Sequence, residues 1–251
     1  MDTSHQIWQL PSQQVTLLPV SEVHVWKAPL VAPEHEYATF QQILSPDERE
    51  RARRFYFEKD RRHWTIAHGI LRILLARYLN TKPHELHFAN NNYGKPTLAA
   101  PFAETGLQFN LSHSAELALY AFTYHRQIGV DVEYMRPNIE WELLARSQFS
   151  SAECSALQML PSSLQEKAFF LCWSRKESYI KAKGMGLSLP LDQFDVSLVP
   201  DEPAHLLDSR EEAQATTHWS LNALEPGNDY AGALTVEGFD WHLRCWQWMM
   251  E

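Results

Sequence analysis

Residues 169–191 read FFLCWSRKESYIKAKGMGLSLPL and set a charged cluster into an otherwise hydrophobic helical pattern. At a spacing of three to four residues, Glu177 and Lys181 fall on one stripe of the predicted helix, beside a second stripe that contains Lys176. Gly184 and Gly186 end the helix and let the backbone approach a bulky neighbour. Taken alone, the pattern also fits an ordinary surface Glu/Lys pair worth about 0.2–0.5 kcal/mol.

The length, charge and cysteine content of the chain limit the kinds of protein that it can be. The chain has 251 residues, of which 45% are hydrophobic, so it can form one large domain or two of ordinary size. Its net charge of −9 argues against nucleic acid or an anionic membrane as a partner, and an anionic ligand would need a local basic pocket. Cys154, Cys172 and Cys245 lack metal-ligand spacing and predict free thiols. With no leader-like start and no long apolar run, we expect a cytoplasmic protein.

The order of predicted elements repeats once along the chain. Each half has a strand, then helices, then three strands, and the alternative is a chance recurrence of this order. We therefore predict an α+β fold with a pseudo-twofold arrangement of two similar α+β lobes, 1–125 and 126–251. Each lobe would be a small, mainly antiparallel sheet with helices packed on it, and a site between them would draw ligands from both.

The predicted strands are 23–26, 85–89, 107–111 and 117–124 in the first half, and 127–134, 194–198, 218–223 and 230–236 in the second. The predicted helices are 48–79, in two segments, 141–160 and 164–183. A final aromatic run, 241–248, looks like an added strand. The polar residues 201–217 are expected to form a mobile excursion.

Three acids are the candidate metal ligands. In Ile128-Gly-Val-Asp-Val-Glu133 the alternation places Asp131 and Glu133 on one face of a strand and the valines in the core. An edge strand with solvated acids is the plain alternative. With Glu177 from the helix, the set becomes an all-oxygen site that suits Mg²⁺, or Mn²⁺, better than Zn²⁺.

Magnesium held by a few carboxylates usually serves phosphate chemistry, so basic and hydroxyl side chains near the acids become candidate phosphate ligands. Candidates are Lys176 and Lys181 beside Glu177, the turn Tyr93-Gly-Lys-Pro96, and the strand end Asn110-Leu-Ser-His-Ser114. Residues 48–62 add seven Lys or Arg against four acids, in a chain that is acidic overall. Each candidate also has an ordinary structural explanation as a turn lysine, a strand-end histidine or a solvated helix face.

Together these motifs closely resemble the 4'-phosphopantetheinyl transferases, in their long, monomeric, two-lobed type. The motifs are Tyr93-Gly-Lys-Pro96, Phe109-Asn-Leu-Ser-His-Ser114, Gly129-Val-Asp-Val-Glu133, Trp173-Ser-Arg-Lys-Glu-Ser178, Lys181 and Gly184-Met-Gly-Leu-Ser-Leu-Pro190. Their order and spacing match from about residue 45 to residue 195. The resemblance implies transfer of the phosphopantetheine arm of coenzyme A to a serine of an apo acyl or peptidyl carrier protein.

The resemblance also implies residue roles. Asp131, Glu133 and Glu177 would hold Mg²⁺ on the pyrophosphate, Lys181 would contact the attacked phosphate, and Glu177 is the candidate base. The residues implied for the rest of coenzyme A are Arg51, Tyr93, Gly94, Lys95, Pro96, Asn110, Ser112, His113 and Lys176. Two departures bear on the adenosine: Glu48 stands where relatives often carry a basic residue, and Trp64 where they carry a small one.

For the protein substrate, residues 134–160 offer an apolar and basic surface around Arg136 and Arg146. Its apolar members would be Met135, Trp141, Phe149, Leu157 and Met159. A core role is the alternative for most of them, and it is favoured for Leu157 and then for Trp141. A magnesium-dependent hydrolase of coenzyme A and a coenzyme A-binding module without turnover are the rival functions. Two lobes in one chain predict a monomer.

Overall fold

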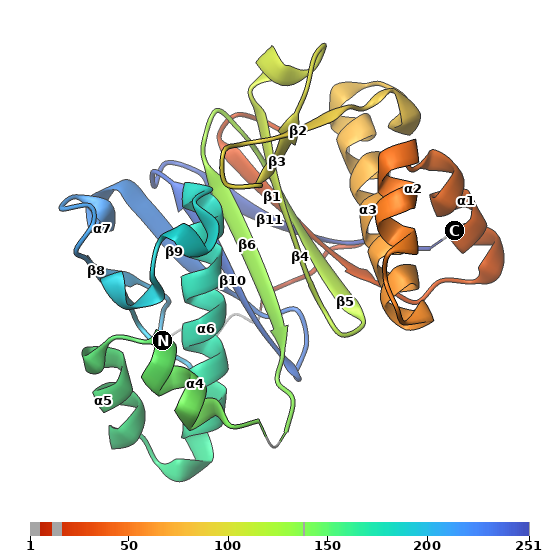
Figure 1. Cartoon of the computed structure of the whole chain (residues 1–251). Helices are drawn as coiled ribbons and strands as arrows, with labels where there is room; N and C mark the ends of the chain where they lie inside the picture. Colours follow the sequence, from red (N-terminus) through yellow and green to blue (C-terminus); the bar gives the residue numbers. More distant parts are fainter. Residues whose placement is uncertain (1–5, 12–16, 138, 251) are drawn as a thin grey trace.

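The computed structural model describes residues 6–11, 17–137 and 139–250, and it arranges them in four layers of helices, sheet, sheet and helices (Figure 1). The first sheet has the strand order β11-β1-β5-β4, and the second has the order β6-β10-β9. Two further pairs, β2-β3 and β7-β8, stand apart from these sheets. The prediction of two α+β lobes, each with a small, mainly antiparallel sheet, is confirmed.

The two halves follow one plan. In the first, β1 (Glu22–Pro29) precedes α1 (Glu34–Ile43), α2 (Pro46–Arg53) and α3 (Glu58–Leu79), and then come β2 (Phe88–Asn90), β3 (Pro96–Leu98), β4 (Leu107–Ser114) and β5 (Leu117–Tyr124). In the second, β6 (Ile128–Tyr134) precedes α4 (Trp141–Gln148), α5 (Ser151–Met159) and α6 (Ser162–Lys183). After α6 come β7 (Phe194–Val196), β8 (Leu206–Ser209), α7 (Ala215–His218), β9 (Trp219–Leu224) and β10 (Tyr230–Glu237). Short 3₁₀ turns lie at Pro83–Glu85, Ala103–Thr105, Gly186–Ser188 and Leu191–Gln193.

The central strand β5 shows why the sheets stack. Its sequence LALYAFTY is apolar on both faces, as a strand covered on two sides must be. Tyr120 and Phe122 belong to the core shared with α3, whereas Leu119 and Ala121 belong to a core shared with the second sheet. The first sheet is therefore covered by helices on one face and by the second sheet on the other.

Glycine lets α6 lie directly on β6. A Cβ atom added to Gly129 would meet the backbone oxygen of Ser178 at 2.1 Å and the backbone nitrogen of Ala182 at 2.3 Å. Only glycine can therefore occupy this position without moving the helix. At its end α6 stops at Gly184, which has φ +67°, as the sequence predicts.

Several expectations need correction. The added strand β11 (His242–Gln247) pairs in parallel with β1, so the end of the chain joins the sheet of the first lobe. Residues 201–217 carry β8 and α7 and are held by ion pairs of Lys183 with Glu212 and of Arg210 with Asp195. The excursion is structured because its acids and bases find partners in α6 and β7.

Element boundaries differ in three places. The expected helix 141–160 is divided into α4 and α5, because Ser150 caps a new helix by a reciprocal pair of hydrogen bonds with Glu153. The expected strand 85–89 is a 3₁₀ turn followed by β2, which pairs with β3. Helix α1 is absent from the sequence prediction, whereas the division of 48–79 into α2 and α3 is confirmed.

Two findings bear on the class of protein. Cys154, Cys172 and Cys245 are free thiols, as predicted. Within the described ranges, no helix has the length and apolar character needed to cross a membrane.

Candidate active site

Asp131 is the centre of the acid cluster and is only 2% exposed. Its Oδ1 accepts hydrogen bonds from Lys181 Nζ at 2.6 Å and from Ser112 Oγ at 2.9 Å. Its Oδ2 is buried and has no hydrogen-bond partner among the described residues. Leaving a buried carboxylate oxygen unsatisfied is unfavourable, so this oxygen is available to a ligand.

Glu133 and Glu177 complete the cluster from two different elements, β6 and α6. The pKa of Glu133 is raised to about 7, mainly by burial and then by the charge of Asp131, while Ser114 and Lys181 oppose the rise. Burial also raises the pKa of Glu177, again with Asp131 adding to the effect. The three carboxylates therefore repel one another, and one ammonium group is present to balance them.

These observations fit a hard cation. The donors are all carboxylate oxygens, one of them is orphaned, and their mutual repulsion would be relieved by a divalent ion. In the part of the chain that the structure describes, no group of three or more His, Cys, Asp or Glu side chains is already gathered closely enough to hold a metal. Lys181 instead lies on Asp131 Oδ1.

Side chains of β4 join the two sheets. Three of them alternate along the strand, and their oxygens accept hydrogen bonds from three backbone N–H groups that alternate along β6. The pairs are Asn110 with Val130 at 2.8 Å, Ser112 with Val132 at 3.4 Å and Ser114 with Tyr134 at 3.0 Å. Ser114 also donates to Glu133 Oε2 at 3.1 Å. The same serines thus align the strands and orient the acids, which fixes the first lobe against the second at this point.

The turn between β2 and β3 reaches the end of α6. Lys95 Nζ donates to the carbonyl oxygens of Ile128 at 2.8 Å and Ala182 at 3.3 Å, while Asn91 Nδ2 donates to that of Gly184 at 2.7 Å. Burial lowers the pKa of Lys95 to about 8. Two of the three donor directions of this ammonium group are therefore used by the contact between lobes.

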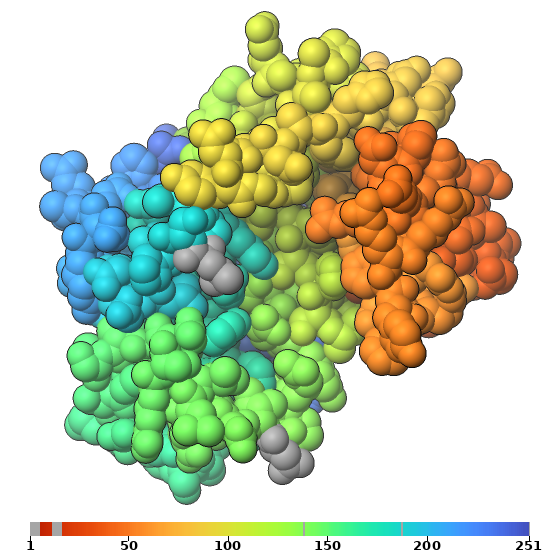
Figure 2. Space-filling model, in the orientation of Figure 1, coloured from red at the N-terminus to blue at the C-terminus, as the bar shows by residue number. Residues whose placement is uncertain are grey.

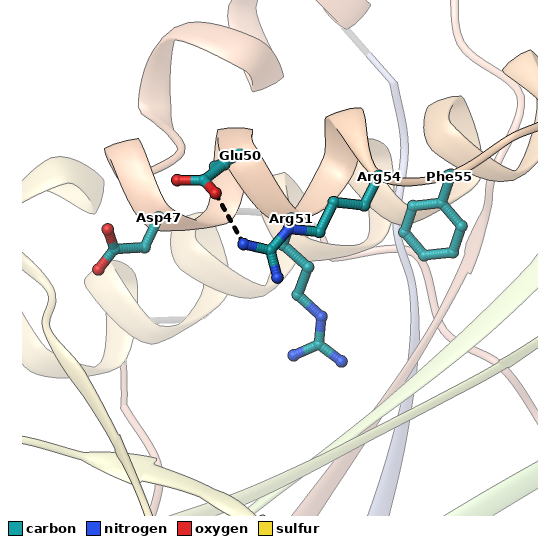
Figure 3. A pocket seen from close by; sticks show the side chains of 5 residues that line it. All are labelled: Asp47, Glu50, Arg51, Arg54 and Phe55. Atoms are coloured by element: carbon teal, nitrogen blue, oxygen red, sulfur yellow. Dashed lines mark hydrogen bonds and ion pairs between the residues drawn. The ribbon is translucent and has the colours of Figure 1, made fainter.

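A cavity of about 980 Å³ opens between α2, α3 and the strands β2 and β4. It reaches the cluster through Asn110 and His113, which line it and lie on either side of Ser112, the hydrogen-bond partner of Asp131. Among the predicted coenzyme A residues, its lining includes Arg51, Gly94, Pro96, Asn110 and His113. Figure 3 shows Arg51 projecting from α2 toward the strands, apart from Arg54, which pairs with Glu50. In the space-filling view, a hollow separates the orange helices from the green and teal helices (Figure 2).

The departures at Glu48 and Trp64 have structural roles. Glu48 completes the cap of α2 with Ser45 and forms an ion pair with Arg72 at 2.7 Å. Trp64 stacks on His68 with ring centroids 3.8 Å apart, and both residues line the cavity. Burial lowers the pKa of His68 to about 3, so the pair presents a neutral aromatic surface at neutral pH.

The prediction that Lys176 binds phosphate is wrong. Its side chain is fully buried, its Nζ lies 2.8 Å from Glu153 Oε2, and it donates to the carbonyl oxygens of Leu191 and Phe194 at 2.6 Å each. One residue along a helix turns the side chain by about 100°, so Lys176 points into the lobe while Glu177 points toward the cleft. Tyr93, by contrast, lies exposed on its turn and is absent from the cavity lining.

Sequence reasoning assigned no individual role to three contributors. Ser114 holds Glu133, Arg72 pairs with Glu48, and His68 lines the cavity. The period of two in Asn110, Ser112 and Ser114 was visible and could have indicated Ser114. The roles of Arg72 and His68 depend on packing between helices and had no local pattern.

Comparison with known proteins gives consistent results. Residues 29–124 match a model described as the N-terminal part of 4'-phosphopantetheinyl transferase, and residues 127–235 match the 4'-phosphopantetheinyl transferase superfamily. The chain is 42% identical to the 4'-phosphopantetheinyl transferase HetI of Nostoc sp., over 96% of this chain and 98% of HetI. It is 37% identical to the 4'-phosphopantetheinyl transferase Sfp of Bacillus subtilis, over 67% and 72% of the two chains. The solved holo-[acyl-carrier-protein] synthase (AcpS) of Thermotoga maritima is more distant, at 16% identity and a TM-score of 0.33 over 45% of this chain and 62% of its own.

Proposed function

Because this chain belongs to the 4'-phosphopantetheinyl transferase superfamily, we propose that it transfers 4'-phosphopantetheine from coenzyme A to a serine of an apo carrier protein. The products are the holo carrier protein and adenosine 3',5'-bisphosphate. The observation that carries the proposal is the cluster of Asp131, Glu133, Glu177 and Lys181 beside a cavity large enough for a nucleotide.

Coenzyme A would lie with its adenosine in the cavity and its pyrophosphate at the cluster. Trp64 and His68 offer a stacking surface for the base, and Arg51 and His113 supply donors for the phosphate on the ribose. Lys181 and Ser112 stand beside the pyrophosphate position. Lys95 keeps one donor free and can serve the same anion while it clamps the lobes.

Asp131, Glu133 and Glu177 would hold Mg²⁺, with Mn²⁺ as a substitute, and Asp131 Oδ2 is the oxygen best placed to accept it. When bound, the ion neutralises pyrophosphate oxygens during phosphoryl transfer. Lys181 adds a fixed positive charge beside the same oxygens. The partial burial of these groups strengthens their electrostatic effect.

The chemical step exchanges one P–O bond for another. The serine oxygen attacks the phosphorus that carries the pantetheine arm, and the bond from that phosphorus to the bridging oxygen of the pyrophosphate breaks. Glu177 is the candidate acceptor of the serine proton, because its raised pKa makes the carboxylate more basic than an exposed glutamate. The departing bisphosphate keeps the electron pair, and the charge of Lys181 stabilises it.

The test is intact mass spectrometry of a panel of apo carrier proteins incubated with the protein, coenzyme A and Mg²⁺. We expect a mass gain of one phosphopantetheine arm, abolished by EDTA and restored by excess Mg²⁺. Release of bisphosphate without any carrier would favour a hydrolase. Tight coenzyme A binding without a gain on any carrier would favour a binding module and would contradict the proposal.

The carrier protein would dock beside α4. Exposed residues there include Leu143, Leu144, Met159, Arg136 and Arg146. Phe149, expected from the sequence to share this surface, is a core residue. Leu157 is a core residue, as the sequence favoured, and Trp141 is only partly exposed. We further propose that the protein is cytoplasmic. We also propose that it is a monomer, since a single chain supplies both walls of the site.

A further inference from the structure

An aromatic pair stands exposed where α3 begins. Tyr56 is 91% exposed and Phe57 is 64% exposed, and their rings pack edge to face with centroids 4.9 Å apart. Large aromatic side chains on the surface are unusual unless they contact a partner. Because the two rings already hold each other in place, a partner would lose little entropy in ordering them.

The surroundings of this pair are basic. Arg53 precedes it, is exposed and makes no ion pair with any residue that the structure describes. Arg54, by contrast, pairs with Glu50, and Lys59 pairs with Glu116 at 3.2 Å. Residues 48–62 carry an excess of three positive charges within a chain of net charge −9. An apolar group beside an exposed arginine, in a segment of net positive charge, is complementary to a partner with an apolar patch next to acidic side chains.

The pair lies beside the mouth of the proposed site. Glu116, the partner of Lys59, forms the turn after β4 and is two residues from Ser114, which holds Glu133. Figure 1 shows the start of α3 near the β4–β5 turn and across the gap from α4. In Figure 2 the orange lobe and the green lobe face each other over a yellow-green floor.

We propose that Tyr56, Phe57 and Arg53 form a second docking wall for the acidic, serine-bearing face of the carrier protein, opposite the wall on α4. This inference rests on the proposed transferase function. A serine that reaches the acids at the floor of the cleft brings the surrounding face of its protein against both walls. The aromatic pair then packs against the apolar part of that face, and Arg53 forms ion pairs with its acidic side chains.

Steady-state kinetics with the carrier protein that the wild-type enzyme modifies best tests this wall. For Tyr56→Ala with Phe57→Ala we expect the KM for carrier to rise roughly five- to twentyfold, with the KM for coenzyme A within about twofold of wild type. Arg53→Glu should raise the carrier KM roughly threefold or more, and added salt should narrow the difference. Tyr56→Ala alone substitutes for the double variant if the latter fails to fold.

Phe239→Ala is the matched control, because Phe239 is 59% exposed and follows β10 at the end remote from Glu133. Its kinetics should equal those of the wild type. An unchanged carrier KM in both Tyr56→Ala and Arg53→Glu overturns the docking wall while leaving the transferase function standing, as does an equal rise in both KM values. If the wild type modifies no carrier, the function and the wall are both overturned.

Discussion

Helices α3 and α6 are both 22 residues long, and each covers the outer face of its sheet, yet only α6 brings acids to a site. Each carries one buried cation paired with an acid from the cap of the preceding helix. The pairs are Arg72 with Glu48 at 2.7 Å and Lys176 with Glu153 at 2.8 Å. Each cation also donates to two later backbone carbonyls, and each helix ends at a left-handed residue, Asn80 or Gly184.

These landmarks align the two halves residue by residue. Counting from Arg72 and Lys176, Ile73 corresponds to Glu177 and Arg77 to Lys181. In the first sheet Trp26 of β1 pairs with Tyr120 of β5, and in the second sheet Asp131 of β6 pairs with Ala233 of β10. Aligning these two strand pairs matches Trp26 with Asp131 and Ala28 with Glu133. The first lobe keeps the scaffold but replaces the acids with apolar residues, and Trp248 lies over Arg77, 4.8 Å from its guanidinium carbon. The pseudo-twofold scaffold and the chemistry are therefore separable.

The largest effect is expected for Glu177→Gln, which tests the contrast between α6, with its acid, and α3, without one. We expect it to lower the transfer rate by roughly 10²–10⁴-fold, because it removes a proton acceptor and one charge of the acid cluster. The melting temperature should stay near that of the wild type, since Glu177 borders the cleft. Ile73→Gln at the matching position should leave the rate unchanged, and retention of near-normal turnover by Glu177→Gln would falsify the site.

The two buried ion pairs allow a comparison of stability. Lys176→Met should cost about 3–5 kcal/mol in the free energy of unfolding, because it leaves Glu153 charged and buried. Arg72→Met should cost less, since Glu48 is more exposed and keeps its hydrogen bond to the backbone N–H of Ser45. Urea unfolding measures both.

Adding Glu153→Gln to Lys176→Met should recover part of the loss, because the isolated charge is removed. If Lys176→Met instead proves to be as stable as the wild type yet weakens coenzyme A binding, Lys176 binds the ligand and does not act as a buried structural cation.

His68, in the cavity wall of the first lobe, should make the stability of the protein depend on pH. The pKa of His68 is about 3 in the folded protein and near 6.5 in the unfolded chain, so the unfolded state takes up the proton first as the pH falls. Its contribution to stability is complete above pH 6.5 and is lost on acidification between pH 6.5 and 3, at up to about 1.4 kcal/mol per pH unit. Thermal unfolding of His68→Phe should show a shallower loss across this window. A parallel loss in the variant would contradict the assignment.

The smallest effect is expected at the α4 wall. Arg136→Glu with Arg146→Glu should raise the KM for carrier protein roughly three- to tenfold and spare that for coenzyme A, because exposed charges act mainly on encounter. Glu142→Gln, on the same helix, serves as a charge-changing control that should not raise this KM. An unchanged KM in the double arginine variant would remove this surface from consideration.

Most of the architecture was accessible from local pattern. The alternation in 128–133 predicted β6, the helical pattern from residue 48 predicted α2, whose start Ser45 and Glu48 cap, and Gly184 predicted the end of α6. Each of these rests on short-range physics, namely strand pleat, helix capping and backbone freedom. The pairing of β11 with β1 was inaccessible, because strand partners far apart in sequence leave no local pattern.

The sequence by itself determined the family, the repeated α+β plan and the three acids with Lys181, because motif order and periodicity are properties of the chain. The tertiary structure alone decided which charges are available to a ligand. Lys176 and Glu177 are adjacent in sequence, yet one is locked to Glu153 inside the lobe and the other faces the cleft. The physical reason is that the neighbours brought together by folding set the burial and the pairing of each charged side chain. Those neighbours decide whether the side chain stabilises the fold or can bind a ligand.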